Sequence, residues 1–157
     1  MSSAIQNESL PSRIEVYEAL EKRLSGMKQK KQAIDVITYA GNGEPTLHPE
    51  FPGIIDDSIK LRDKYFPEAK IAVLSNSSSI GNPAIREALL KVDSNILKLD
   101  SAFELTVRIH NQPRVNLKIG ELIENLKQFK GRLIIQTLFV RGKFKDRIID
   151  NTTTEEI

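Results

Sequence analysis

Short runs of β-branched residues alternate along this chain with longer stretches whose apolar residues recur at helical spacing, and this alternation restricts the fold most. Strands separated by helices favour parallel pairing through right-handed crossovers. The sequence therefore predicts an α/β fold with four parallel strands and intervening helices, in a single domain over residues 1–157. The helices are expected near residues 12–27, 53–66, 83–92 and 117–129, and the strands near 34–40, 71–74, 95–100 and 133–140.

Local signals support several of these boundaries. Ser12 and Glu15 form a capping-box pattern at the start of the first helix, and Asn82 before Pro83 predicts another helix start. The first strand is mostly apolar and β-branched, which predicts burial on both faces. The run Leu133–Val140 predicts the longest strand.

Composition excludes several classes of protein. With 39% hydrophobic and 28% charged residues and a net charge of +2, the chain is typical of a soluble globular domain. No segment is apolar for long enough to cross a bilayer, and the first residues lack the pattern of a secretory signal, so we expect a cytoplasmic protein without membrane partners. The absence of cysteine excludes disulfides, thiol nucleophiles and cysteine-ligated metals within this chain.

Basic residues are concentrated in the last third of the chain, where Arg141, Lys143, Lys145 and Arg147 alternate with other residues. Two interpretations stay open for the segment 141–147. A solvated loop after a buried strand is the favoured one, because charge runs are usually solvated. A strip that binds phosphate groups of nucleic acid is the other.

Polar residues follow each predicted strand, at the edge where parallel α/β sheets bind ligands. A glycine pair around Asn42 would let a ligand approach the backbone. Asp100 suits hydroxyl groups such as those of a ribose, and Lys98 suits a carboxylate. The structural alternatives are a simple turn, a capping asparagine at Asn76 and an ion pair between Lys98 and Asp100.

The positions of the histidines and serines in the sequence do not favour a metal site or a catalytic triad. The two histidines, His48 and His110, fall in separate segments, so no metal ligands are predicted. No nucleophile elbow of the G-x-S-x-G type is present. No catalytic residue is therefore assigned.

The run Ile37–Phe51, with Asn42-Gly43-Glu44-Pro45 at its centre, resembles the GGEP segment of radical S-adenosylmethionine (radical SAM) enzymes. The later strands, near residues 74–76, 97–101 and 135–140, resemble those of the Fe–S oxidoreductases grouped with tRNA wyosine-synthesis enzymes. The resemblance extends from about residue 12 to the end of the chain.

This resemblance implies a partial (β/α) barrel in which a 4Fe–4S cluster, bound by three cysteines, cleaves S-adenosylmethionine to a 5'-deoxyadenosyl radical. The GGEP segment would meet the methionine amino group through its backbone, and polar residues that end the later strands would hold the ribose and the carboxylate. The residues carried over are Gly41, Asn42, Gly43, Glu44, Asn76, Lys98 and Asp100, with Gln136 as a looser match.

The chain departs from that family in having no cysteine, so it cannot bind the cluster by itself. We expect the isolated chain to be inactive and to be the middle of a longer oxidoreductase, truncated at both ends; a degenerate relative that has lost the cysteine segment is the alternative. The substrate is not identified by the sequence, and a tRNA base, a protein side chain and a metabolite stay open. The alternatives are a non-catalytic α/β binding module for RNA or a protein partner, and a structural fragment that pairs through an open sheet edge.

Overall fold

A parallel sheet of four strands organises the chain. The computed structural model describes residues 10–40, 43–111, 118–144 and 147–155. Neighbouring strands pair in the order β1-β2-β3-β4, and all three pairings are parallel. This confirms the predicted α/β class with intervening helices. The strands are β1 (Val36–Tyr39), β2 (Lys70–Ser75), β3 (Ser94–Lys98) and β4 (Ile134–Gln136).

Two of the helices begin where capping residues predict them. The Glu15 amide donates to the Ser12 hydroxyl, and the Ser12 amide donates to the Glu15 carboxylate, so the predicted capping box is present. The Asn82 side chain accepts from the amide of Ala84. Within the described residues, no helix is both long and apolar enough to cross a membrane. The helices are α1 (Arg13–Gln29), η1 (Pro45–Leu47), α2 (Phe51–Tyr65), α3 (Pro83–Leu89), α4 (Glu104–Asn111) and α5 (Ile119–Lys127).

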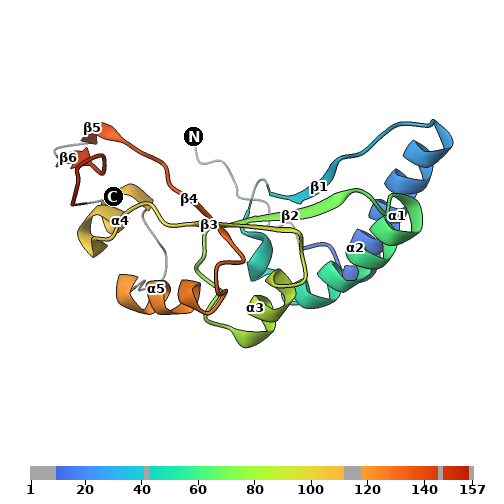
Figure 1. Cartoon of the computed structure of the whole chain (residues 1–157), viewed down its shortest axis with the longest axis horizontal. Helices are drawn as coiled ribbons and strands as arrows, with labels where there is room; N and C mark the ends of the chain where they lie inside the picture. The colour runs from blue at the N-terminus through green and yellow to red at the C-terminus, as the bar shows by residue number, and fades with distance from the viewer. Residues whose placement is uncertain (1–9, 41–42, 112–117, 145–146, 156–157) are drawn as a thin grey trace, which may run out of the picture.

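The helices cover one face of the sheet and leave the other open (Figure 1). In β1, Ile37 and Tyr39 pack against the core, whereas Val36 and Thr38 are exposed. The prediction that this strand is buried on both faces is therefore wrong, because no described helix covers its second face. We call that second side the open face. The core between sheet and helices includes Phe51, Ile55, Ile71, Val73, Leu89, Leu97, Leu122 and Phe129.

The last predicted strand is shorter than expected. β4 has only three residues, so the prediction of one long strand over 133–140 is wrong. Beyond it, the amide of Leu138 donates to Asp100 and the amide of Val140 to Asn151, which replaces strand pairing by side-chain hydrogen bonds. The chain then forms a second, antiparallel sheet from β5 (Arg141–Phe144) and β6 (Arg147–Asp150). The favoured loop over 141–147 is thus largely a hairpin, of which residues 145–146 lie outside the described chain.

Candidate functional site

The carboxyl ends of β1 to β4 lie at one edge of the sheet because the strands are parallel. We call this the carboxyl edge. Ser75 lies beside Leu97 in the register, so Asn76 and Lys98 follow at the ends of neighbouring strands. Of the predicted site residues, the structure describes Gly43, Glu44, Asn76, Lys98, Asp100 and Gln136, and Gly41 and Asn42 lie outside the described residues.

Glu44 joins the loops that follow β1 and β2. One carboxylate oxygen accepts from the amide and the hydroxyl of Thr46, at 3.2 and 2.6 Å. The other oxygen accepts from the amide of Asn76 at 2.6 Å. Hydrogen bonds to a carboxylate are among the stronger ones in proteins. Both oxygens are thus engaged, and Glu44 holds the two loops together.

The turn after β2 has an unusual backbone. Ser77 has a φ of 66°, a left-handed conformation that non-glycine residues adopt at an energetic cost. Its hydroxyl is buried without a hydrogen-bond partner among the described residues. Asn76 beside it is exposed, and its side-chain oxygen accepts from the amide of Ser78 at 2.9 Å. The capping alternative for Asn76 is therefore confirmed, and its amide nitrogen is left at the surface.

Lys98 and Asp100 form an ion pair at the end of β3. The Lys98 Nζ lies 2.9 Å from the Asp100 Oδ2. The Asp100 side chain is fully buried, whereas that of Lys98 is 32% exposed. The other oxygen of Asp100 accepts from the amide of Leu138 at 2.9 Å. The structural alternative of an ion pair is confirmed, and Asp100 is closed to a ligand's hydroxyls.

Gln136 lies directly opposite Lys98 in the pairing of β3 with β4, so the two residues share a face. On β3, Asn95 and Leu97 are buried toward the helices, and the alternate residues, Lys98 included, are half-buried on the open face. Gln136 is exposed. The site thus presents one ammonium and one amide side by side on the open face.

The groups left accessible suit binding rather than proton transfer. Lys98, Gln136 and the amide nitrogen of Asn76 donate hydrogen bonds, and Gly43 has open space where a side chain would stand. Both predicted carboxylates, Glu44 and Asp100, are engaged within the protein. The arrangement therefore fits a ligand with an anionic group and hydroxyl or carbonyl oxygens.

His48 is part of the loop structure. Its Nε2 lies 2.7 Å from the carbonyl of Pro11, and its Nδ1 accepts from the amide of Glu50 at 3.1 Å. Both ring nitrogens are thus used within the chain. The side chain of His110 lies outside the described residues. Over the described parts, no group of three His, Cys, Asp or Glu side chains is placed to hold a metal ion.

A 4Fe–4S cluster does not fit the donor groups of this chain. Such clusters are held by cysteine thiolates, and the sequence contains none. The carboxylates at the carboxyl edge are turned to internal partners. No chemical step through a cluster follows from these residues.

Asn151 was missed by the sequence reasoning although it is 1% exposed and joins three segments. Its amide nitrogen donates to the carbonyls of Asp100 and Leu138, at 2.7 and 2.8 Å, and its side-chain oxygen accepts from Val140 at 2.6 Å. It thereby fixes the hairpin to the carboxyl edge. A single asparagine in a polar stretch carries no periodic signal from which this role could be predicted.

The basic segment 141–147 has a partly compensated charge. Arg141 pairs with Asp150 across the hairpin at 3.2 Å. Lys143 is exposed and lies opposite Ile148, which is 82% exposed. The outer face of the hairpin thus mixes charged and apolar side chains, and its phosphate-binding role stays a prediction.

No family model matches the chain. A UPF0026 protein from Methanocaldococcus jannaschii is 28% identical over 144 residues, which covers 89% of this chain and 42% of that protein. A UPF0026 protein from Synechocystis is 28% identical over 69% of this chain and 40% of its own length. A UPF0026 protein from Helicobacter pylori is 31% identical over 69% of this chain and 35% of its own length. The chain therefore spans between 35% and 42% of these relatives.

These comparisons correct the assignment made from the sequence. The three relatives are named UPF0026 proteins, and none carries the name of a radical SAM enzyme. The assignment to the radical SAM superfamily, and to its Fe–S oxidoreductase branch, is therefore wrong on these findings. The motif that suggested it is short, and glycine and proline also serve an ordinary strand-to-helix turn. Glu44, its acidic residue, has a structural role in this chain.

Proposed function

We propose that the carboxyl edge and the adjoining open face bind a small molecule with an anionic group and several hydroxyls, as the ligand-binding part of an enzyme. The observation that carries this proposal is the adjacency of Lys98 and Gln136 in register on a face that no described helix covers. Ligands of parallel α/β sheets bind at this end of the strands. The ion pair with buried Asp100 restrains the ammonium of Lys98 before a ligand arrives.

S-adenosylmethionine is the ligand that we propose to test first. Its carboxylate would pair with Lys98, and its ribose hydroxyls would accept from the amides of Gln136 and Asn76. The exposed backbone near Gly43 would face its amino group. The chain itself is proposed to bind this molecule and to carry out no cleavage, since the thiolates for a cluster are lacking.

The same proposal extends to the shape of the sheet. Parallel strands with helices on one face only are typical of a (β/α) barrel, whose second face is the barrel interior. We propose that the four strands are part of such a partial barrel. Lys98 and Gln136 would then point toward the interior, where the ligand would be shielded from water.

Calorimetric titration of the whole chain with S-adenosylmethionine tests the proposal. Gln136→Ala removes the amide of an exposed side chain, and we expect the affinity of the chain for S-adenosylmethionine to fall roughly fivefold, or about 1 kcal/mol. Lys98→Met should lower affinity roughly tenfold, whereas Lys98→Arg keeps the charge and should retain most binding. Lys127→Ala, on the helical side at the surface, is the matched control and should leave affinity unchanged.

Titration with methionine and with adenosine separates the two halves of the ligand. The effect of Lys98→Met should appear with methionine, which carries the carboxylate, and not with adenosine. The proposal fails if no binding heat is measured at millimolar ligand. It also fails if the folded variants, checked by circular dichroism, bind like the wild type.

A further inference from the structure

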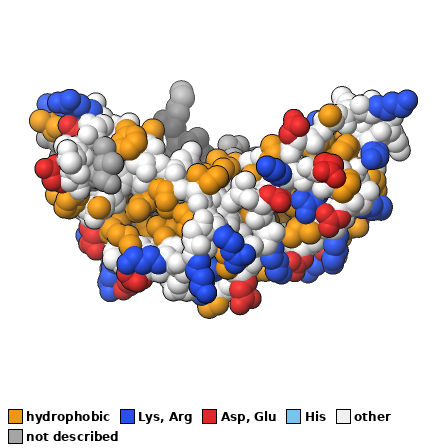
Figure 2. Space-filling view, viewed as in Figure 1, with side chains coloured by type: hydrophobic (Ala, Val, Ile, Leu, Met, Phe, Trp, Pro, Cys, Tyr) orange, Lys and Arg blue, Asp and Glu red, His pale blue; other side chains and the backbone are white. Residues whose placement is uncertain are grey.

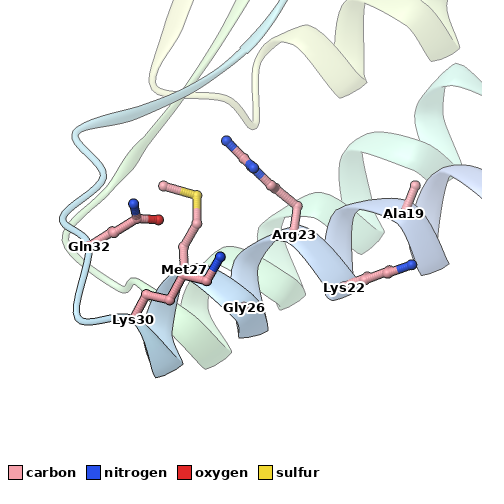
Figure 3. A pocket seen from close by; sticks show the side chains of 7 residues that line it. All are labelled: Ala19, Lys22, Arg23, Gly26, Met27, Lys30 and Gln32. Carbon is pink, nitrogen blue, oxygen red and sulfur yellow. The ribbon is translucent and has the colours of Figure 1, made fainter.

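A shallow groove lies along the second half of α1, away from the carboxyl edge (Figure 3). Its volume is about 380 Å³. Arg23 and Met27 rise from the helix on the side where Gln32 approaches from the segment that leads to β1. The groove is lined by Ala19, Lys22, Arg23, Gly26, Met27, Lys30 and Gln32.

The floor of the groove is apolar and open. Gly26 carries no side chain, and a Cβ built on it would meet no atom within 4 Å. Ala19 lies about two turns of helix before Met27 along α1, and these two residues supply the rest of the floor. A side chain from outside can therefore reach the helix backbone at Gly26.

The rim of the groove is cationic and uncompensated. Among the described residues, no carboxylate pairs with Lys22, Arg23 or Lys30. Other charges of α1 are used within the protein, since Glu21 pairs with Lys64 at 2.8 Å and Lys28 lies over the ring of Phe66. The groove thus combines three available positive charges with an apolar floor.

We propose that this groove binds an acidic amphipathic helix of a partner protein. The lining residues of α1 and its C-cap Lys30 span positions 19 to 30, which corresponds to about 16 Å along the helix. Apolar side chains of the partner would cover Gly26 and Met27, and its acidic side chains would pair with the cations on the rim. A nucleic acid fits less well, because single strands are held by aromatic stacking and the groove has no aromatic residue.

Fluorescence anisotropy with the whole chain and labelled peptides tests this inference. The probe is a helical peptide with leucine at every third or fourth position and glutamate between. One control peptide replaces glutamate by glutamine, a second replaces leucine by serine, and a uridine oligonucleotide carries the same charge. We expect the first peptide to bind roughly tenfold more tightly than the other three probes.

Two variants locate the binding site. Gly26→Leu fills the open floor while it improves helix propensity, so a roughly tenfold loss of affinity cannot reflect unfolding. Arg23→Glu with Lys30→Glu should abolish binding, whereas Lys130→Glu, at an exposed lysine in the turn after α5, should not. The inference is overturned if Gly26→Leu binds like the wild type, if the oligonucleotide binds as tightly as the peptide, or if no probe binds.

Discussion

At the scale of single residues, the acidic side chains of the carboxyl edge are used for its own structure. Glu44 and Asp100 each accept a hydrogen bond from a backbone amide that belongs to a different loop. An amide left without a partner in such a place would lower stability, so these carboxylates are needed whether or not a ligand binds. The side chains beside them that stay accessible, Lys98 and Gln136, are hydrogen-bond donors.

Glu44→Gln tests this role. Glutamine keeps one acceptor oxygen and loses the negative charge, so it cannot accept from both Thr46 and Asn76 as the carboxylate does. We expect the free energy of unfolding to fall by roughly 0.5–1.5 kcal/mol, as measured by urea denaturation. Glu68→Gln, at an exposed position before β2, is the control and should change it little. An unchanged stability in Glu44→Gln would contradict the structural role.

The pair of Arg13 and Asp57 joins α1 to α2 and predicts a pH dependence. Two guanidinium nitrogens donate to the carboxylate at 2.6 and 2.9 Å, and this hydrogen bonding holds the pKa of Asp57 below its ordinary value of 3.8. A lowered pKa in the folded state stabilises the fold above the unfolded value, and the contribution is lost as pH falls through the folded one.

We therefore expect Arg13→Gln to be less stable than the wild type at neutral pH, and the difference to shrink as pH falls below 3.8. Urea denaturation over a pH series measures it. Lys91→Gln breaks an ion pair with Asp56 in which both partners are more than 40% exposed, so it should have little effect at any pH. A pH-independent loss in Arg13→Gln would mean that packing, and not charge, is responsible.

At the scale of helices and strands, local chemistry explains what the sequence could predict. The capping residue Ser12 and the pair Asn82-Pro83 act within a few residues, so both helix starts were predictable. The end of β4 was not predictable, because it depends on distant side chains. Asp100 lies 38 residues from Leu138, whose amide it accepts from, and Asn151 lies 11 residues from Val140. β-Propensity over 133–140 favoured a strand that distant side chains cut short. α4 lies in a stretch without a strong signal.

Asn151→Ala tests how the hairpin is held. The change removes three hydrogen bonds and leaves the amide of Val140 and two carbonyls without these partners. We expect a loss of roughly 1–3 kcal/mol in unfolding free energy, and faster hydrogen exchange in β5 and β6 than in β2. Thr153→Ala, at an exposed site two residues later, should change neither. If hydrogen exchange became faster to the same extent in both sheets, the substitution would be destabilising the whole fold and not the hairpin alone.

At the scale of the whole molecule, the paired polar residues of the site follow from topology. Parallel order alone brings Asn76, Lys98 and Gln136 to one edge, which is why their adjacency could be predicted without coordinates. One-sided coverage was not predicted, because the mostly apolar run of β1 is the pattern of a strand buried on both faces. That coverage decides which side chains are accessible, and it leaves Lys98 and Gln136 accessible on the open face.

β4 is an edge strand of the parallel sheet, and it carries no charged side chain. The run Leu133–Val140 contains neither a charged residue nor proline, and Ile134 and Ile135 are 53% and 44% exposed. Hydrophobic side chains gather in the region where β4, α4 and α5 lie (Figure 2). The Gln136 carbonyl accepts a hydrogen bond from the amide of Leu99. Because the peptide groups of successive residues in a strand point in opposite directions, the amide and carbonyl of Ile135 point away from β3. Natural sheets usually protect such edges with charge or proline.

We therefore expect the chain to self-associate through the β4 edge as its concentration rises. Sedimentation over roughly two decades of concentration should show a shift from monomer to larger species. Ile135→Lys places a charge on the edge and should suppress that shift, because two like charges would meet where two copies pair. Leu105→Lys, at an α4 residue that is 65% exposed, removes a similar apolar surface and should not. A wild-type chain that stays monomeric throughout would show that this edge is protected by other means.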